Sequence, residues 1–286
     1  MRSVLFATLA AAALLGCNES AAPVSTPAEA ASPDRFDSGR AWGLLKYQVA
    51  LGPRPAGSRA SRKLAAYIKR RLPNGSYQRV PGGLRNVVGK VPGREPDRVV
   101  LVGAHYDTKD IRGFVGANDA ASGTAVALRL AREVKPRTIR PTLLFVFFDG
   151  EESPRGAADD EFEEKGLRGS KVAAARYAGG VDAMVLLDFV GDRDLSIPRE
   201  QYSDATLWAQ LRAAAGRAGA SRTFPDEVSG GVLDDHIPFI QRGVPSIDLI
   251  DFDFPCWHRR CDDLSAVSER SLDRVGETVR ELLPRL

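Results

Sequence analysis

Four continuous apolar runs, each ending in or near acidic or imidazole side chains, constrain the fold of this chain more than any other feature. They are RVVLVGAH (98–105), TLLFVFFDG (142–150), AMVLLDFVG (183–191) and VPSIDLID (244–251). Uninterrupted apolar runs of this length are typical of strands buried on both faces, as in parallel sheets covered by helices. A shorter run at 86–91 predicts an additional strand beside the first of the four.

Segments with the spacing of amphipathic helices lie between these runs. They cover residues 58–72, 123–134, 170–178, 204–217 and 268–283. The alternation predicts an α/β fold: a single domain with a mostly parallel central sheet and helices on both faces. No second domain is indicated in the 286 residues. Lys and Arg outnumber Asp and Glu by only 40 to 37, without a long basic run, so no nucleic-acid partner is expected.

The first residues predict export. An apolar run follows Arg2 and is shorter than the ~20 residues that span a bilayer, which is typical of a signal peptide over residues 1–16. The small residues before Cys17 resemble the lipobox of bacterial lipoproteins, which implies a lipid on the Cys17 sulfur; an ordinary signal peptide is the alternative. Residues 17–36 predict a flexible tether and 37–286 a catalytic domain. We therefore expect an exported monomer, either secreted or held on the periplasmic side of a bacterial membrane only by its lipid anchor.

Histidine is scarce, and each of the three histidines lies among acids. His105 is in HYD, His236 in DDH and His258 in WHRRCDD. This setting indicates functional roles for the histidines. For His236 the alternative is that it only orients a neighbouring side chain. Because ligands bind at the carboxyl ends of parallel strands, we expect the side chains that follow the strands to meet in one crevice.

Two further motifs supply carboxylates to this crevice. In GANDAASG (116–123), Asp119 precedes a helix; it is interpreted as a metal ligand among small neighbours, with a helix N-cap as the alternative. In FFDGEES (147–153), Glu151 and Glu152 directly follow a buried strand and could divide metal binding and proton transfer. Oxygen and nitrogen donors without thiolates favour zinc, although other divalent ions fit the same donors. The acidic run 159–164 is interpreted as the solvated face of an inserted loop.

With Cys17 assigned to the N-terminal region, Cys256 and Cys261 remain on either side of His258. In an oxidising compartment two remaining cysteines usually pair, so we predict a disulfide that braces the loop of His258; thiolate ligation of a metal is the alternative. One of Asp262 and Asp263 is expected to accept the second imidazole N–H of His258.

The ordered motifs HYD, GANDAASG, FFDGEES, LLDFVGD, DDHIPF, RGVPSI and WH, within residues 51–279, resemble the zinc aminopeptidase superfamily of the bacterial leucyl aminopeptidase type. Within it, they are most similar to the animal-type glutaminyl-peptide cyclotransferases. That resemblance implies one Zn²⁺, bound by Asp119, Glu152 and His258. It implies Glu151 as the general acid and base, with Asp188 and Asp234 as proton-sharing acids. It also implies that Trp257 contacts the substrate.

The aminopeptidases of this superfamily bind two metals at matching positions, which would add His105 and Asp188 as ligands here. Three details favour the cyclases, namely Gly150 before the glutamate pair, Asp234 where the peptidases carry Ser, and Trp257 where they commonly carry Tyr. One detail departs from the cyclases, because no Trp follows the glutamate pair; Phe252 or Phe254 is expected to form that part of the substrate wall. The implied activity converts N-terminal Gln of peptides or proteins to pyroglutamate with release of ammonia. The alternative is a di-zinc aminopeptidase.

Overall fold

The computed structural model describes residues 35–286. The expected signal peptide, the expected lipidation site Cys17 and most of the expected tether lie outside the described residues. The last tether residue, Phe36, is buried in the core, and its backbone N–H donates to the carboxylate of Glu277. Among the described residues, no helix is both long enough and apolar enough to cross a membrane.

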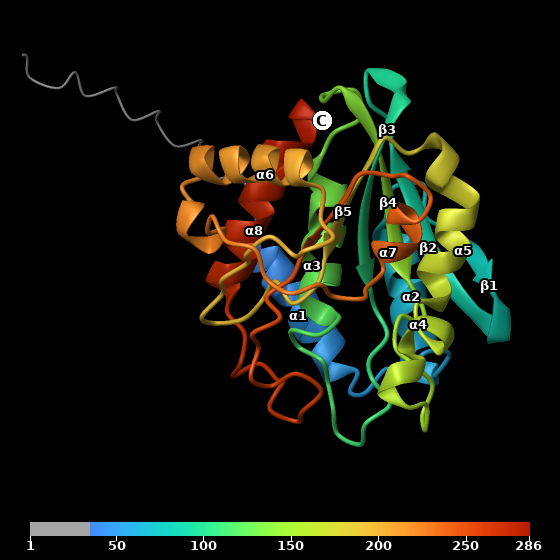
Figure 1. Ribbon diagram of the computed structural model, residues 1–286. Coiled ribbons are helices and arrows are strands. Elements are labelled where there is room, and N and C mark those ends of the chain that lie inside the picture. Colours follow the sequence, from blue (N-terminus) through green and yellow to red (C-terminus); the bar gives the residue numbers. More distant parts are fainter. Residues whose placement is uncertain (1–34) are drawn as a thin grey trace, which may run out of the picture. The chain divides into compact units, whose positions relative to one another are not determined.

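Six strands form one mixed sheet in the order β1-β2-β4-β3-β5-β6 (Figure 1). Their bounds are β1 Ser76–Val80, β2 Leu84–Val91, β3 Glu95–His105, β4 Pro141–Phe148, β5 Ala183–Leu187 and β6 Ser246–Leu249. The strands β4, β3, β5 and β6 run parallel, whereas β1 and β2 pair antiparallel with their neighbours. The predicted mostly parallel α/β sheet is confirmed.

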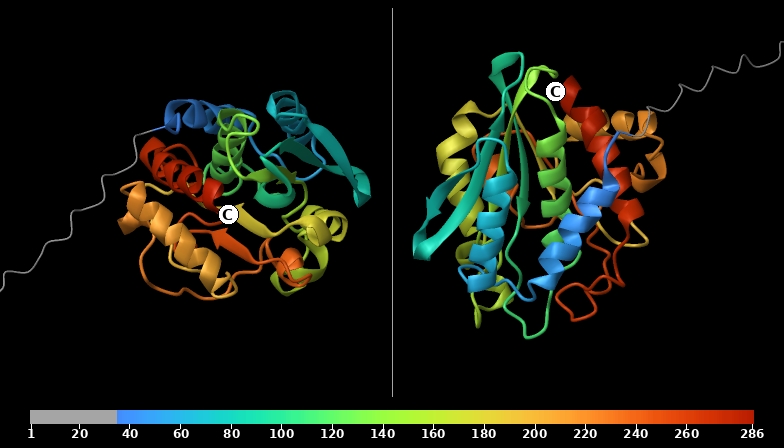
Figure 2. Two further views of the ribbon diagram at one scale, coloured as in Figure 1. Left: turned by 90° about the horizontal axis from the view of Figure 1, so that it is seen from above. Right: turned by 180° about the vertical axis from the view of Figure 1, so that it is seen from behind.

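Helices cover both faces of this sheet (Figure 2). Their bounds are α1 Ser38–Ala50, α2 Arg59–Arg71, α3 Ala121–Glu133, α4 Phe162–Lys165, α5 Arg168–Tyr177, α6 Ala205–Arg217, α7 Ile237–Ile240 and α8 Glu269–Leu282. The larger core cluster joins one sheet face to residues of α1, α2, α3, α6 and α8. The smaller cluster joins the other face to α5 and α7. All eight residues of β4 are buried between these two layers, which explains its unbroken apolar sequence.

The position of β2 differs from the prediction. We expected this strand beside β3, which follows it in sequence, but β2 pairs with β4, and β4 separates it from β3. The fully buried β4 needs hydrogen-bond partners along both edges, because a buried strand edge leaves backbone groups unpaired. Parallel β3 supplies one edge and antiparallel β2 supplies the other.

Helix α3 begins beside the end of β5. A side chain at Gly123 could not be accommodated, since its Cβ would lie 1.9 Å from the carbonyl oxygen of Leu187. This close approach brings the turn before α3 next to the residues that follow β5, where the acidic side chains converge.

Candidate functional site

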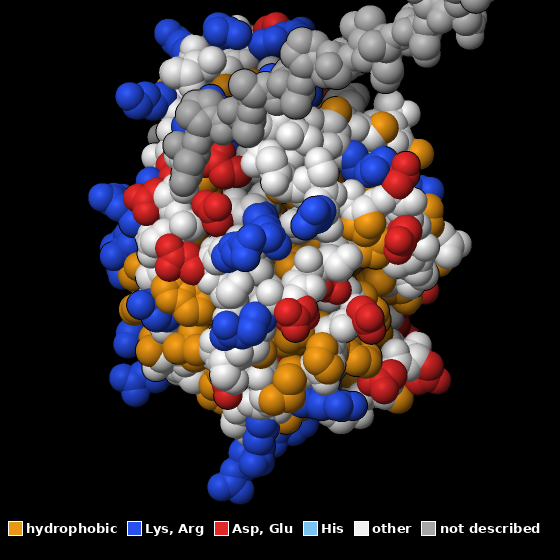
Figure 3. All heavy atoms as spheres, turned by 90° about the vertical axis from the view of Figure 1, so that its left-hand side faces the viewer, with side chains coloured by type: hydrophobic (Ala, Val, Ile, Leu, Met, Phe, Trp, Pro, Cys, Tyr) orange, Lys and Arg blue, Asp and Glu red, His pale blue; other side chains and the backbone are white. Residues whose placement is uncertain are grey.

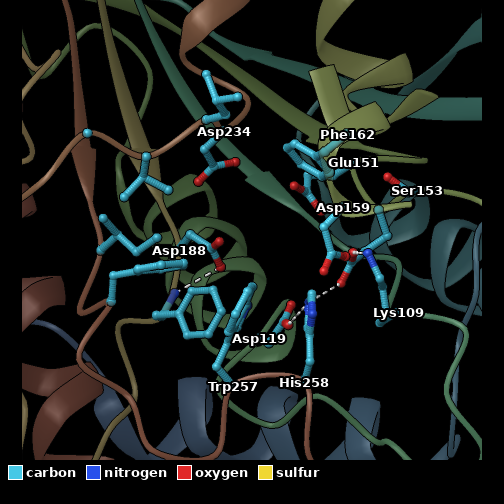
Figure 4. Close-up of a pocket in the computed structure, with 17 residues that line it drawn as sticks. Lys109, Asp119, Glu151, Ser153, Asp159, Phe162, Asp188, Asp234, Trp257 and His258 are labelled. Atoms are coloured by element: carbon cyan, nitrogen blue, oxygen red, sulfur yellow. Dashed lines mark hydrogen bonds and ion pairs between the residues drawn. The ribbon is translucent and has the colours of Figure 1, made fainter. Parts of the chain in front are cut away.

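The expected crevice forms at the carboxyl ends of β3, β4 and β5 (Figure 4). His105 is the last residue of β3, the pair Glu151–Glu152 follows β4, and Asp188 follows β5. Asp119 comes from the turn before α3, and His258 from the loop after β6. Four of these segments line one cavity of about 280 Å³, and His105 lies next to it, within 3.4 Å of the carboxylates of Asp119 and Asp188.

Asp119 lies between the two histidines. Its Oδ2 is 3.4 Å from Nε2 of His258, and its Oδ1 is 3.4 Å from Nε2 of His105. The N-cap alternative does not hold, because Ala120 precedes the first residue of α3 and no side chain caps that helix end. The Asp119 carboxylate is thus free to face the cavity.

Two groups of potential metal ligands share Asp119. The first contains Asp119, Glu152 and His258, with Glu152 Oε1 3.1 Å from His258 Nε2. The second contains His105, Asp119 and Asp188, with Asp188 Oδ1 3.3 Å from His105 Nε2. Within each group the donor atoms lie within 4.8 Å of one another.

The residues of both groups fit a divalent cation. Oδ2 of Asp119 and both ring nitrogens of His105 are buried without a hydrogen-bond partner among the described residues, which is costly unless another group satisfies them. The donors are carboxylate oxygens and imidazole nitrogens, the set that zinc accepts. Glu152 also forms an ion pair with Lys109 at 3.1 Å. Burial alone would raise the pKa of Glu152, but His258 and Lys109 lower it below its ordinary value, which keeps this carboxylate charged.

Glu151 lies beside these groups with its carboxylate in the cavity, 7% exposed. Burial raises its pKa well above the ordinary value, and the charge of Glu152 adds to this, although His105 opposes it. Its Oε2 is 3.8 Å from Nδ1 of His105. A carboxyl group in this setting exchanges protons nearer to neutral pH than an exposed glutamate does.

Asp107 fixes the turn that carries the glutamate pair. Its two carboxylate oxygens accept the backbone N–H groups of Gly150, Glu151 and Glu152 at 2.9, 3.2 and 3.3 Å. Gly150 has φ +77°, a conformation that glycine adopts without strain. Sequence reasoning assigned no role to Asp107. The available signal was its position two residues after His105, because alternate side chains of an extended segment point to the same side.

Asp188 and Asp234 are buried and line the same cavity. Burial raises the pKa of Asp234 well above its ordinary value, and the charge of Asp188 adds to this. Behind Asp234, the carboxylate of Asp248 is also fully buried. His236 does not reach the cavity: its Nε2 is 3.2 Å from Glu200 Oε2, and its Nδ1 is 3.7 Å from Asp248 Oδ2. His236 therefore belongs to a buried polar cluster behind the cavity, and sequence reasoning missed Glu200 and Asp248.

The disulfide between Cys256 and Cys261 is present, with the two Cα atoms 5.4 Å apart. It closes a ring that contains His258, whose φ is +52°, and Trp257, whose indole stacks on the imidazole with centroids 4.6 Å apart. The expected acidic partner of His258 is not found in this segment. Asp262 instead accepts the backbone N–H groups of Asn118 and Asp119 at 2.7 and 3.0 Å, and Asp263 accepts from Ser265.

Aromatic and aliphatic side chains form the remaining wall of the cavity. They are Phe162, Phe189, Val232, Leu233, Ile250, Phe252 and Trp257. Of the two phenylalanines expected in this wall, Phe252 lines the cavity, whereas Phe254 is 4% exposed and packs beneath the wall against Phe189. The run 159–164 is not only a solvated face, since Asp159 and Phe162 also line the cavity. No local sequence pattern marks that contact, which depends on how the inserted loop folds back.

Comparison with known proteins places this geometry in a family. The family model of peptidase family M28 matches residues 86–283, the range that contains every cavity residue described above. The chain belongs to peptidase family M28. The site of this M28 chain thus lies wholly within the matched region.

Relatives of the M28 chain carry two kinds of description. The glutaminyl-peptide cyclotransferase of Bos taurus is 30% identical over 229 residues, 64% of this chain and 61% of the relative, and that of Drosophila melanogaster is 28% identical over 220 residues. The chain spans about 60% of the length of these curated relatives. Among solved structures, an Acidobacteriales bacterium glutaminyl cyclase is 31% identical with a TM-score of 0.75, covering 91% of this chain and 97% of that one. A leucine aminopeptidase precursor of Bacteroides thetaiotaomicron is 26% identical with a TM-score of 0.79, covering 90% and 99%.

Proposed function

We propose that this M28 protein is a zinc-dependent glutaminyl-peptide cyclotransferase that acts on peptide or protein N-termini. The observation that carries the proposal is a buried Glu151 beside the ligand group Asp119, Glu152 and His258, in a cavity that holds two more buried acids. The names of the relatives at about 30% identity support the same activity.

In this proposal Asp119, Glu152 and His258 would hold one zinc ion, which would supply a Lewis acid for the γ-amide carbonyl of the substrate. The α-amine of the N-terminal glutamine forms the new C–N bond to that carbonyl carbon, and the bond to the amide nitrogen breaks. Glu151 accepts one proton from the attacking amine and delivers it to the departing ammonia. The amine and amide belong to one residue, so the reaction needs no activated water and benefits from their proximity.

The other cavity residues take supporting roles in the proposal. Asp188 and Asp234 share protons with Glu151, which their burial favours. Trp257 and Phe252, whose rings lie 5.2 Å apart, form the apolar wall that excludes water from the glutamine side chain. Phe162 lines the cavity from the segment that follows the glutamate pair, where this chain has no tryptophan.

The decisive variant is Glu151→Gln. It preserves the size of the side chain and removes its ability to accept a proton, so we expect kcat for ammonia release from a Gln-initiated peptide to fall by roughly 10²–10⁴-fold. Zinc content, measured on the purified protein, should remain unchanged. The matched control is Glu164→Gln, an exposed glutamate on the inserted loop, which should keep full activity. Normal ammonia release by Glu151→Gln would refute the assignment of Glu151.

The second candidate is a di-zinc aminopeptidase. The group His105, Asp119 and Asp188 is the observation that favours it, because it offers ligands for a second ion. Release of leucine from an aminoacyl anilide, two zinc ions per chain and no cyclisation of Gln-peptides would establish this alternative. One zinc per chain with ammonia release would exclude it.

We also propose that residues 1–16 direct export, that Cys17 carries a lipid and that residues 17–36 tether a monomeric catalytic domain on the periplasmic side of a bacterial membrane. The support is the sequence pattern before Cys17. Mass spectrometry of the membrane-extracted protein would show a lipid-modified N-terminal cysteine; an unmodified soluble chain would favour the secreted alternative.

A further inference from the structure

The end of the molecule opposite the cavity carries a concentration of basic side chains. We define the amino-end basic surface as the exposed residues Arg35, Arg94, Lys135, Arg137 and Arg285. They lie at the amino ends of β3 and β4 and at the end of α8. This clustering is notable because the whole chain carries a net charge of only +3.

Backbone contacts join the parts of this surface. The loop before β3 and the loop before β4 lie together, since the N–H of Arg94 donates to Ile139 at 3.0 Å and the N–H of Arg137 donates to Pro92 at 2.7 Å. A hollow lined by Lys135, Arg35 and Arg285 continues the surface to the end of α8.

Three of the five cations lack an ion-pair partner in the described chain, although the exposed acids Glu95 and Asp97 lie at the same end of the molecule. Arg35 and Arg285 pair with the buried carboxylate of Glu281. Within residues 35–286, by contrast, Arg94, Lys135 and Arg137 form no ion pair within 4 Å, and all three are exposed. Arg137 carries its long cationic side chain at a backbone position with φ +61°, where glycine would be less strained.

The surface lies far from the cavity and at the end where the described chain begins. Arg94 directly precedes β3 and His105 ends it, so a strand of 11 residues separates them by roughly 30–35 Å. Figure 3 shows Lys and Arg side chains along the upper edge of the molecule, and Arg35, the first described residue, belongs to this end. A tether leading from Cys17 would therefore reach the domain at its basic end.

We propose that the amino-end basic surface binds anionic phospholipid headgroups and docks the domain on the membrane with its cavity facing away. Lys and Arg side chains close to a bilayer are attracted by anionic lipids, over a range set by a Debye length of about 8 Å. The large exposed apolar residues of the described chain all lie in other segments. The contact is therefore electrostatic, without insertion of side chains into the hydrocarbon. This membrane contact is separate from the proposed reaction, and the proposed lipid anchor would only keep the domain close to the membrane.

The test uses the exported chain with Cys17→Ser, which cannot carry a lipid on that residue, and vesicles of phosphatidylglycerol mixed with phosphatidylcholine. We expect co-sedimentation with these vesicles at low salt, its loss at high salt, and none with pure phosphatidylcholine. Arg94→Glu/Lys135→Glu/Arg137→Glu should weaken the partition coefficient at least roughly a hundredfold, given about fivefold for each of the three cations removed from the surface. Ammonia release from a Gln-peptide should be unchanged in this variant, because the substitutions lie several Debye lengths from the cavity.

The matched control is Arg59→Glu/Arg62→Glu/Lys63→Glu, which makes the same change of charge in the exposed first turn of α2, near the cavity end. It should bind the anionic vesicles as the parent does. Equal losses in both variants would show a nonspecific effect of net charge and overturn the proposal. Unchanged binding in the amino-end variant would also overturn it. A failure here with full cyclase activity would leave the proposed reaction intact, so the two proposals fail separately.

Discussion

Asp119 is held in place from two sides by residues that do not touch the cavity. Asp262 accepts the N–H groups of Asn118 and Asp119. Arg54, which is 0% exposed, donates to four carbonyl oxygens, two in the segment before this turn and two at the end of α1 or just after it. These belong to Gln48, Gly52, Val115 and Gly116. This buried guanidinium connects the turn to the end of α1, because its donors bond carbonyl oxygens of both segments.

Asp262→Asn should therefore lower metal affinity in a folded protein. The amide keeps one acceptor oxygen but loses the second and the negative charge, so the turn that carries Asp119 is less firmly oriented. We expect roughly tenfold weaker zinc binding, the lower end of the effect seen when a residue that orients a ligand is changed. Competition with a chelator measures it. Asp263→Asn is the control, since Asp263 contacts only its own turn; equal affinities in the two variants would contradict the role of Asp262.

At the scale of elements, the loop after β6 and the turn before α3 act as one unit. The disulfide ring places His258 and Trp257, and Asp262 directly after the ring holds the Asp119 turn. The loop that carries His258 and the turn that carries Asp119 are thereby joined, although more than a hundred residues separate them in sequence. The alternative of a thiolate ligand does not hold, because the two sulfur atoms are bonded to each other as predicted.

Cys256→Ser/Cys261→Ser removes the ring without leaving a free thiol. Loss of the chain constraint from so short a ring should lower the free energy of unfolding by about 2 kcal/mol. Zinc affinity should fall as well, because His258 must then keep its left-handed backbone conformation without the brace. Thermal unfolding and chelator competition measure the two effects, with the chemically reduced parent as the comparison. Unchanged zinc affinity in a protein that lacks the bond would rule out the bracing role.

At the scale of the whole molecule, burial of acids also makes stability depend on pH at positions outside the proposed metal site. Asp251 is 4% exposed, and burial raises its pKa to about 6, although the N–H of Ser196, 2.8 Å from its Oδ2, and the backbone of Asp253 oppose this rise. The unfolded carboxyl has a pKa near 3.9. Between these values the native state binds a proton that the unfolded state lacks, so the free energy of unfolding falls as pH rises from about 4 to 6.

Asp251→Asn should remove this contribution. The free energy of unfolding of the variant minus that of the parent should be up to about 2 kcal/mol larger at pH 7 than at pH 4. Urea unfolding across that pH range measures this difference. Asp97→Asn, which changes an exposed aspartate in β3, should follow the parent at every pH. A parallel pH dependence of Asp251→Asn and the parent would show that another group is responsible.

The sequence alone determined the chemical types at the site and the strands that carry them. The apolar runs and the acids after them are local patterns, and the strands β3, β4, β5 and β6 form where those patterns lie. Helix α1 and edge strand β1 escaped prediction because few of their residues are buried, so their apolar spacing is weak.

Only the tertiary structure decided how those residues meet. Asp119 faces both histidines because α3 packs against the end of β5, and Phe252 rather than Phe254 lines the cavity because the loop after β6 turns one ring inward and the other into the core. The position of β2 and the assembly of the amino-end basic surface likewise depend on contacts between distant segments. Local sequence sets backbone preference and side-chain chemistry, whereas long-range packing and backbone pairing select which segments become neighbours.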